Sequence, residues 1–184
     1  MSMKIIAGDL RGRTLQAVRG RGTRPLRSAV REALFNVLGD RCEDAEVWDL
    51  FAGTGASGIE ALSRGARRVV FVEKVNAALN VLRENLDALG LEDDRTEVVK
   101  GDAWEPELDG APDLIFFDPP YAKVAEDPVR AAASAVGLAA RLAPGGLLCF
   151  HFEDGQLDAD DFDDDLEVEL RQWGRSAVAL IGRG

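Results

Sequence analysis

The chain has 184 residues, of which 46% are hydrophobic, and its formal net charge is −11 at neutral pH. This length supports one substantial core, and no stretch rich in proline, glycine or serine divides the sequence. It has no apolar stretch of membrane-spanning length, no signal-peptide core at its start, and too few cysteines and histidines for a disulfide framework or a thiolate zinc site. We therefore expect a single-domain, metal-free protein of the cytoplasm.

The first 31 residues differ in charge from the rest. They carry eight basic side chains against one acid, Asp9, so they have a charge of +7, and the total of −11 leaves −18 for the remainder. Alternating apolar residues in 4–7 and 14–18 predict a hairpin, and Pro25 opens a helix with apolar residues at helical spacing. A local basic segment can bind nucleic-acid phosphates while the remaining surface repels them. The arginines expected to make such contacts are Arg11, Arg13, Arg19, Arg21 and Arg24. A solubilising tail is the alternative.

A buried strand at residues 47–51 is followed by a glycine turn and a helix, the order found in nucleotide sites. Gly53, Gly55 and Gly58 satisfy G-x-G-x-x-G, and Glu73 ends the next strand where a ribose-binding acid would lie. Asp49 precedes the first glycine by four residues and would repel a pyrophosphate. S-adenosylmethionine carries an ammonium and a sulfonium instead, so Asp49 favours this cofactor over NAD or FAD.

The next helix and strand lead to another acid. Leucines at helical spacing predict a helix over residues 76–89 that stops at Gly90, and a strand at 96–99 follows. Asp102, just after this strand, could accept a hydrogen bond from an adenine amino group.

The apolar run 114–117 ends in Asp118-Pro119-Pro120-Tyr121. Two prolines remove two backbone donors and fix φ, which leaves a rigid set of acceptors beside an aromatic ring. The Asp118 carboxylate and the Pro119 carbonyl suit the two N–H groups of an exocyclic base amine, and the Tyr121 ring could stack on the base. A strand-ending turn with a buried aspartate cap is the alternative. The four acids after successive strands would then share the edge where open α/β sheets bind ligands.

The last third completes the sheet. We expect a helix over residues 129–142, a strand at 147–152, and an antiparallel closing hairpin from strands at 166–173 and 177–181. The acidic run 158–165 is predicted to be a solvated, mobile loop because it has almost no apolar content to bury. Repeated strand–helix units predict a doubly wound α/β fold with a seven-stranded, mostly parallel sheet whose last strand is antiparallel.

Several segments together resemble the bacterial small-subunit ribosomal RNA guanine-N2 methyltransferases of the RsmD type. These segments are residues 5–8, 11–13, 24–25, 31–36, 49–66, 71–73, 101–103 and 113–121. The resemblance implies a Rossmann-like class I methyltransferase fold, S-adenosylmethionine as the methyl donor, and methylation of a guanine amine in 16S ribosomal RNA. It also implies a basic RNA-binding extension at residues 1–41 and a catalytic core at 42–184. The chain departs from the family pattern at Leu26, commonly threonine, and at Val75, often polar.

The resemblance carries specific roles onto this sequence. Residues 118–121 fall on the motif that holds the target base. The expected cofactor-binding residues, including neighbours of the matched positions, are Asp49, Phe51, Gly53, Thr54, Gly55, Glu73, Lys74, Asp102 and Ala103. The expected reaction is direct methyl transfer, without a metal or a covalent enzyme intermediate, to a base turned out of its RNA surroundings.

Three alternatives remain at this point. Adenine-N6 methylation of DNA fits because adenine also presents an exocyclic amine. A nicotinamide oxidoreductase would explain the glycines and Glu73 but gives Asp49 and residues 118–121 no role. A non-catalytic RNA-binding factor would not need the acceptor turn. We expect a monomer whose partner is ribosomal RNA or the small ribosomal subunit.

Overall fold

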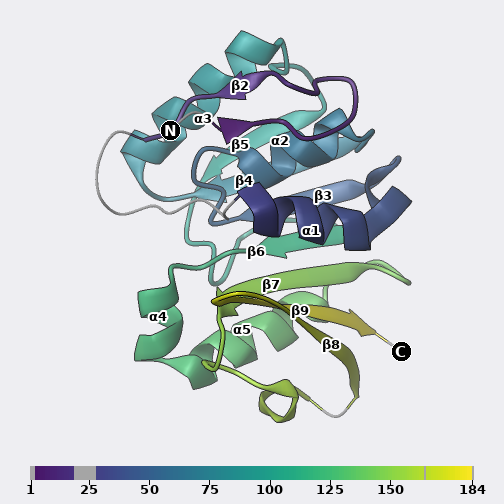
Figure 1. Cartoon of the computed structure of the whole chain (residues 1–184), viewed down its shortest axis with the longest axis vertical. Coiled ribbons are helices and arrows are strands. Elements are labelled where there is room, and N and C mark those ends of the chain that lie inside the picture. The colour runs from purple at the N-terminus through teal and green to yellow at the C-terminus, as the bar shows by residue number, and fades with distance from the viewer. Residues whose placement is uncertain (1–2, 19–27, 164, 184) are drawn as a thin grey trace.

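A twisted seven-stranded sheet forms the centre of the computed structural model, which describes residues 3–18, 28–163 and 165–183 (Figure 1). The strands are β3 (Glu46–Leu50), β4 (Arg68–Glu73), β5 (Thr96–Lys100), β6 (Leu114–Phe117), β7 (Leu147–Glu153), β8 (Leu166–Trp173) and β9 (Ser176–Arg183). Their order is β5-β4-β3-β6-β7-β9-β8. All neighbours are parallel except β9, which is antiparallel to both β7 and β8. The predicted doubly wound sheet with an antiparallel last strand is confirmed.

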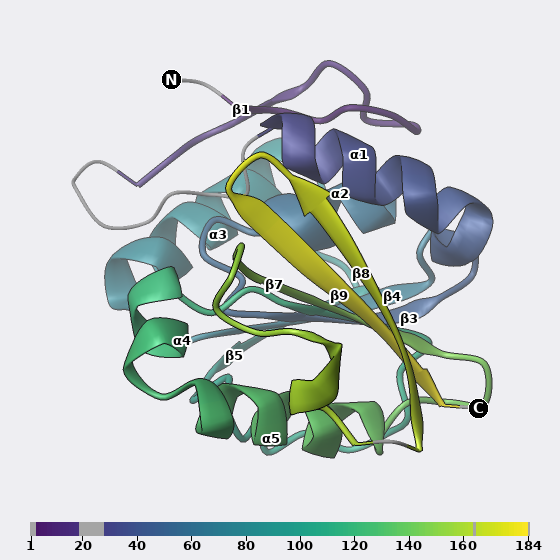
Figure 2. The ribbon, with the colours of Figure 1, turned by 60° about the horizontal axis from the view of Figure 1, so that its bottom comes forward.

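Helices cover both faces of this sheet (Figure 2). One face carries α1 (Ser28–Leu38), α2 (Ala56–Ser63) and α3 (Asn76–Leu89), and the other carries α4 (Tyr121–Glu126) and α5 (Pro128–Ala139). Short 3₁₀ turns are η1 (Gly39–Cys42) and η2 (Ala159–Asp161). The structure confirms α3 with its predicted ends, and Gly90 terminates it with a left-handed φ of 68°. Among the described residues, no helix is long and apolar enough to cross a membrane.

Alternate residues of the central strands enter two different cores. In β4, Phe71 packs with α2 and α3, whereas Val70 and Val72 pack on the α5 side. Because helices cover both faces, β3, β4 and β6 are buried almost throughout. Gly58 allows α2 to approach β4, since an added Cβ there would lie 2.3 Å from Phe71 Cε1. The third glycine of the motif therefore serves helix–sheet packing.

A small antiparallel hairpin of β1 (Met3–Lys4) and β2 (Thr14–Leu15) confirms the predicted N-terminal hairpin. It docks on the end of α2, where Ile6 N and Ala7 N donate to the buried Glu60 carboxylate at 2.8 and 3.0 Å. At Gly8 the fit is so close that an added Cβ would lie 1.6 Å from the Ser63 carbonyl oxygen. The hairpin shares a core with the sheet, and the division between residues 41 and 42 stays a prediction.

Arg31 is buried, whereas the other described basic residues near the N-terminus are exposed. Its side chain is fully buried and donates to the Lys4 carbonyl at 2.6 Å. Burial is the main cause that lowers its pKa, and nearby Glu60 opposes this effect. Arg31 thus holds α1 against the hairpin and adds nothing to a phosphate-binding surface.

The acidic run 158–165, for which the sequence predicts a solvated, mobile loop, contains the short turn η2. Asp158 caps η2 by accepting from Asp160 N at 3.0 Å, and the described acids of the run are exposed. However, Phe162 is only 6% exposed and packs 6.3 Å from the Phe150 ring. The exposed acids agree with the predicted solvation, and the single ring of Phe162 anchors the segment against β7.

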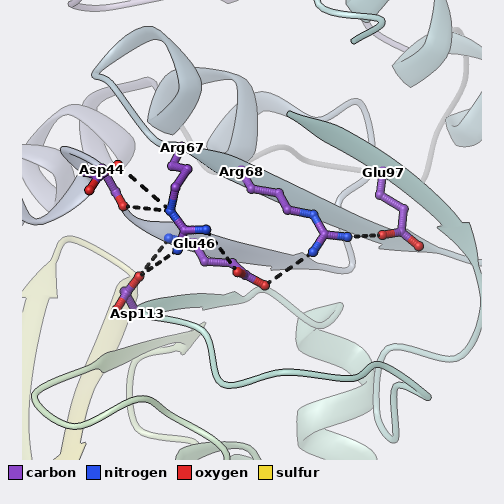
Figure 3. Close-up of polar contacts among 6 residues, drawn as sticks. All are labelled: Asp44, Glu46, Arg67, Arg68, Glu97 and Asp113. Carbon is purple, nitrogen blue, oxygen red and sulfur yellow. Dashed lines mark hydrogen bonds and ion pairs between the residues drawn. The ribbon is translucent and has the colours of Figure 1, made fainter. Parts of the chain in front are cut away.

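Ion pairs link the charged side chains at the amino edge of the sheet (Figure 3). Arg67 and Arg68, at the start of β4, lie on either side of Glu46, with N–O distances of 3.5 and 3.6 Å. Arg68 also contacts Glu97 at 2.5 Å, and Arg67 approaches Asp113 at 4.0 Å. Every acid in this cluster has an arginine partner.

Candidate active site at the carboxyl edge of the sheet

The glycine turn after β3 is shaped by left-handed backbone. Phe51, Gly53 and Gly55 have φ of 59°, 57° and 82°. At Gly55 an added Cβ would lie 2.3 Å from Leu82 Cδ1, so this glycine is needed for packing. At Gly53 an added Cβ would meet only the Phe51 carbonyl oxygen, at 3.9 Å. The backbone at Gly53 therefore faces open space that a ligand could approach closely.

Asp49 lies buried beneath this turn and is 3% exposed. Its Oδ2 accepts a hydrogen bond from Gly58 N at 2.9 Å. Burial, which penalises the charged form, raises the pKa of Asp49 to about 8; the Gly58 hydrogen bond opposes this, and the charges of Asp118 and Glu73 add to it. The site consequently favours a positively charged group beside Asp49, because such a group would stabilise the carboxylate.

Glu73 joins the end of β4 to the glycine turn. Its Oε2 accepts from Gly53 N at 3.0 Å, while Oε1 accepts from Lys74 N and Val75 N, both at 2.8 Å. Glu73 thus caps the backbone at the end of β4. A carboxylate has about four acceptor sites, so three hydrogen bonds leave Glu73 able to accept another.

Asp102 marks the outer end of the site. Its side chain is 53% exposed, Oδ1 accepts from Trp104 N at 3.1 Å, and Oδ2 lies 3.9 Å from Lys74 Nζ. Ala103 is buried beside it. Phe51 is half-buried and meets Trp104 edge-on, with ring centroids 5.2 Å apart. Phe51, Ala103 and Trp104 together form an apolar wall at the carboxyl ends of β3 and β5.

The acceptor turn follows β6. Asp118 N donates to the Leu50 carbonyl at 3.3 Å, which fixes this turn beside the glycine turn. The Pro120 carbonyl accepts from Lys123 N at 2.7 Å and so starts α4, whereas the Pro119 carbonyl lies outside this cap. Tyr121 is the first residue of α4, a helix that the sequence reading did not predict.

His151 completes the site and was missed by the sequence reading. Its Nδ1 lies 2.6 Å from Asp118 Oδ1, and its Nε2 lies 2.7 Å from the Tyr121 hydroxyl. The hydroxyl also lies 2.9 Å from Ser176 Oγ on β9. The only signal in the sequence was a polar residue, the chain's one histidine, inside the apolar strand β7.

The acids of this edge differ from those of the amino edge. Among the described residues, Asp49, Glu73 and Asp118 have no lysine or arginine within ion-pair distance, in contrast to the arginine-paired cluster of Figure 3. Three partly or fully buried carboxyl groups without a lysine or arginine partner in the described residues make a site that favours a cationic ligand over a phosphate, and Asp49 would ionise when such a ligand binds.

The basic residues are only partly described. Arg11 and Arg13 are exposed, and Arg13 Nη2 donates to the Ala88 carbonyl near the end of α3 at 2.8 Å. The predicted phosphate contacts at Arg19, Arg21 and Arg24 lie outside the described residues.

Gln16, which lies just before these arginines in the sequence, is held close to the glycine turn. Asn85 on α3 accepts from Gln16 N at 2.8 Å and donates to the Thr54 carbonyl at 3.0 Å. A single buried amide thus ties the glycine turn to the segment that leads toward the remaining arginines.

Comparisons with known proteins agree with this geometry. The model of the family described as Conserved hypothetical protein 95 matches residues 3–181. Two relatives named Ribosomal RNA small subunit methyltransferase D, from Haemophilus influenzae and Escherichia coli K12, are 37% and 36% identical over 65% of this chain. The matched regions span 64% and 60% of these relatives, which is less than two thirds of their length.

Solved structures share the fold over more of the chain. The structure of the Escherichia coli protein yhhF superposes with a TM-score of 0.81 at 29% identity, covering 100% of this chain and 98% of that one. A Thermus thermophilus 16S rRNA N2 G1207 methyltransferase, RsmC, solved with AdoMet and guanosine, has a TM-score of 0.74 at 23% identity. It covers 100% of this chain and 50% of that one, and at this identity it shows the fold alone.

Proposed function

We propose that this chain, which belongs to the family described as Conserved hypothetical protein 95, transfers a methyl group from S-adenosylmethionine to the exocyclic N2 amine of a guanine in small-subunit ribosomal RNA. The relatives named Ribosomal RNA small subunit methyltransferase D support the substrate, and their names agree with the RsmD-type resemblance of the sequence. The RsmC structure with AdoMet and guanosine supports the pairing of cofactor and base.

The observation that carries the proposal is the arrangement of Asp118. One carboxylate oxygen is held by His151 at 2.6 Å, and the other has no hydrogen-bond partner among the described residues. This open oxygen lies on the same sheet edge as Asp49 and Glu73, for which the described residues offer no lysine or arginine within ion-pair distance. An amine acceptor beside a site for a cationic cofactor is the arrangement that methyl transfer to a base amine requires.

The cofactor-binding residues are assigned by their chemistry. Asp49 would favour the positive charges of the cofactor, Glu73 would accept from ribose hydroxyls, and Asp102 would accept from the adenine amine. When bound, S-adenosylmethionine supplies an electrophilic methyl group. The remaining cofactor-binding residues line the glycine turn and the ends of β4 and β5. They are Phe51, Gly53, Thr54, Gly55, Lys74 and Ala103.

The acceptor turn would orient the target amine. Asp118 and the Pro119 carbonyl each accept one N–H, which directs the nitrogen lone pair toward the methyl donor. The amine is a weak nucleophile because its lone pair conjugates with the ring, so orientation is the main contribution, worth up to about 7 to 11 kcal/mol in favourable cases. The proton released by the amine passes to Asp118. Pro120 fixes the turn, and the Tyr121 ring would contact the base.

Exposed Arg11 and Arg13, with Arg19, Arg21 and Arg24 beyond them in sequence, would bind RNA phosphates and set the register of the substrate. The Asn85 bridge supports this placement because it brings the extension to the glycine turn. Residues 1–41 would then be the RNA-binding extension and 42–184 the catalytic core of one monomeric domain. Asp49 argues against a nicotinamide oxidoreductase, because a pyrophosphate, unlike a cationic cofactor, would not stabilise the ionised form of this buried carboxyl group.

Transfer of label from S-adenosylmethionine to unmethylated small-subunit ribosomal RNA tests the proposal. Asp118→Ala should lower the single-turnover rate by a factor on the order of 100 to 1,000, by analogy with loss of one preorganised polar group at a reacting centre, while cofactor affinity stays within a few-fold. Asp109→Ala is the matched control, because this acid is exposed and its neighbour Gly110 lies beside Glu46 at the opposite edge of the sheet. Full activity in Asp118→Ala would rule out its role as the amine acceptor.

A further inference from the structure

A chain of hydrogen bonds runs beneath the acceptor turn. It begins at Asp118 Oδ1, passes through both nitrogens of His151 and the Tyr121 hydroxyl, and ends at Ser176 Oγ, with successive distances of 2.6, 2.7 and 2.9 Å. The four residues come from the end of β6, from β7, from the start of α4 and from β9. His151 is 5% exposed, so its imidazole ring is fixed in place by packing.

The proton positions in this chain follow from the chemistry of its ends. An ionised carboxylate can only accept, so a neutral His151 must carry its proton on Nδ1 and donate it to Asp118. Nε2 must then accept from the Tyr121 hydroxyl, which in turn accepts from Ser176. One arrangement of three protons satisfies every group, and it selects the Nδ1–H tautomer.

This arrangement restricts both functional groups of the turn. The hydrogen bond to Oδ1 sets the plane of the Asp118 carboxylate. Its other oxygen, Oδ2, has no partner among the described residues and takes no part in this series of hydrogen bonds. The Tyr121 ring meets the His151 ring edge-on at 5.1 Å, and Gln156 Nε2 donates to the Tyr121 carbonyl at 3.0 Å. Residues of β7 and the loop after it thus hold the acceptor and the aromatic ring in one fixed relation.

We infer that His151 is the positioning residue of the acceptor turn: it orients Asp118 and Tyr121 for the target amine without contacting the substrate. The inference rests on the proposed function. In the transfer step the carbon–sulfur bond breaks, the carbon–nitrogen bond forms, and the amine proton moves to Asp118 Oδ2. His151 does not take that proton, since its Nδ1 already carries one and its Nε2 is occupied by Tyr121. The proton leaves through the exposed part of the Asp118 side chain, 30% of which is accessible.

Two substitutions separate positioning from simple packing. His151→Asn places an amide N–H near the level of Nδ1 and keeps the donor to Asp118, whereas His151→Gln places its amide near the level of Nε2 and loses that donor. We expect the single-turnover rate to fall about threefold for His151→Asn, for loss of one neutral hydrogen bond. For His151→Gln we expect a fall of about 10- to 100-fold, as small misplacements of reacting groups produce. S-adenosylmethionine affinity and the melting temperature should be similar in the two variants.

Because His151 is the one histidine of the chain, its imidazole nitrogen signals can be assigned without ambiguity by NMR. The parent should show the Nδ1–H tautomer at a pH where the ring is neutral, and Asp118→Ala should shift the population toward Nε2–H. An Nε2–H tautomer in the parent, or equal rates for His151→Asn and His151→Gln, would overturn the inference. A parent that shows the Nδ1–H tautomer and binds cofactor but methylates no RNA would instead refute the proposed function, and with it the positioning role.

Discussion

Replacing Asp49 by asparagine should make the free protein more stable and the cofactor weaker. Asp49 is 3% exposed, and burial raises its pKa to about 8. Asparagine keeps the shape of the side chain and an oxygen that can accept from Gly58 N, but it cannot ionise. Asp49→Asn therefore removes the free-energy cost of holding this carboxyl group protonated in the folded chain, while leaving the surrounding packing in place.

The size and sign of the stability change follow from proton linkage. The pKa of Asp49 in the folded chain, about 8, lies above the unfolded value of about 3.9, so the folded state holds a proton that the unfolded state releases. The stability that this proton provides is lost as pH rises through that window, by at most about 1.4 kcal/mol per pH unit. The free energy of unfolding of Asp49→Asn minus that of the parent should therefore grow from pH 5 to pH 8.

Urea unfolding at several pH values measures this difference directly. Each kcal/mol also corresponds to about 2 to 4 °C in melting temperature for a chain of this size. The same variant should bind S-adenosylmethionine at least about tenfold more weakly, because a charge-assisted contact is worth about 1.5 to 3 kcal/mol. A difference that does not change with pH would refute the buried-carboxylate argument. Unchanged cofactor affinity would refute the role of Asp49 in binding.

Three further predictions address the cofactor, the RNA and the fold. Glu73→Ala should reduce the rise in melting temperature that S-adenosylmethionine causes, whereas NADH should stabilise neither form; stabilisation by NADH alone would contradict the cofactor assignment. Replacing Arg11 and Arg13 together by alanine should weaken RNA binding. The slope of log affinity against log salt concentration should become shallower by roughly 0.7 to 0.9 per lost phosphate contact. A double variant that binds like the parent across a salt titration would exclude these contacts. Gly58→Ala should destabilise by about 1 to 3 kcal/mol, since its Cβ would lie 2.3 Å from a β4 ring atom, whereas Gly137→Ala, in the open, should be neutral or stabilising. Equal melting temperatures for the two glycine variants would contradict the packing argument.

Most of the fold could be predicted because local signals agree with the tertiary structure. The leucine spacing of α3 and the left-handed residue Gly90 define that helix without reference to the rest of the chain. The apolar runs of β3, β4 and β6 identify strands buried on both faces. The acids at the strand ends then follow from the topology, since parallel strands place their carboxyl ends on one edge.

The parts that sequence reasoning missed depend on contacts between distant segments. Nothing local pairs His151 with Asp118, which lie 33 residues apart on neighbouring strands. Arg31 counts as a surface charge until its contact with the Lys4 carbonyl is known. Phe162 stands alone in an acidic run, and only its packing against Phe150 shows that it anchors the segment.

The identity of the methylated nucleoside tests the central claim most directly. The protein would be incubated with S-adenosylmethionine and unmethylated small ribosomal subunits or their RNA, and the digested nucleosides would be analysed by mass spectrometry. The account predicts N2-methylguanosine, formed by the parent and lost in Asp118→Ala. N6-methyladenosine as the product, or no methylated nucleoside from a protein that binds the cofactor, would contradict it.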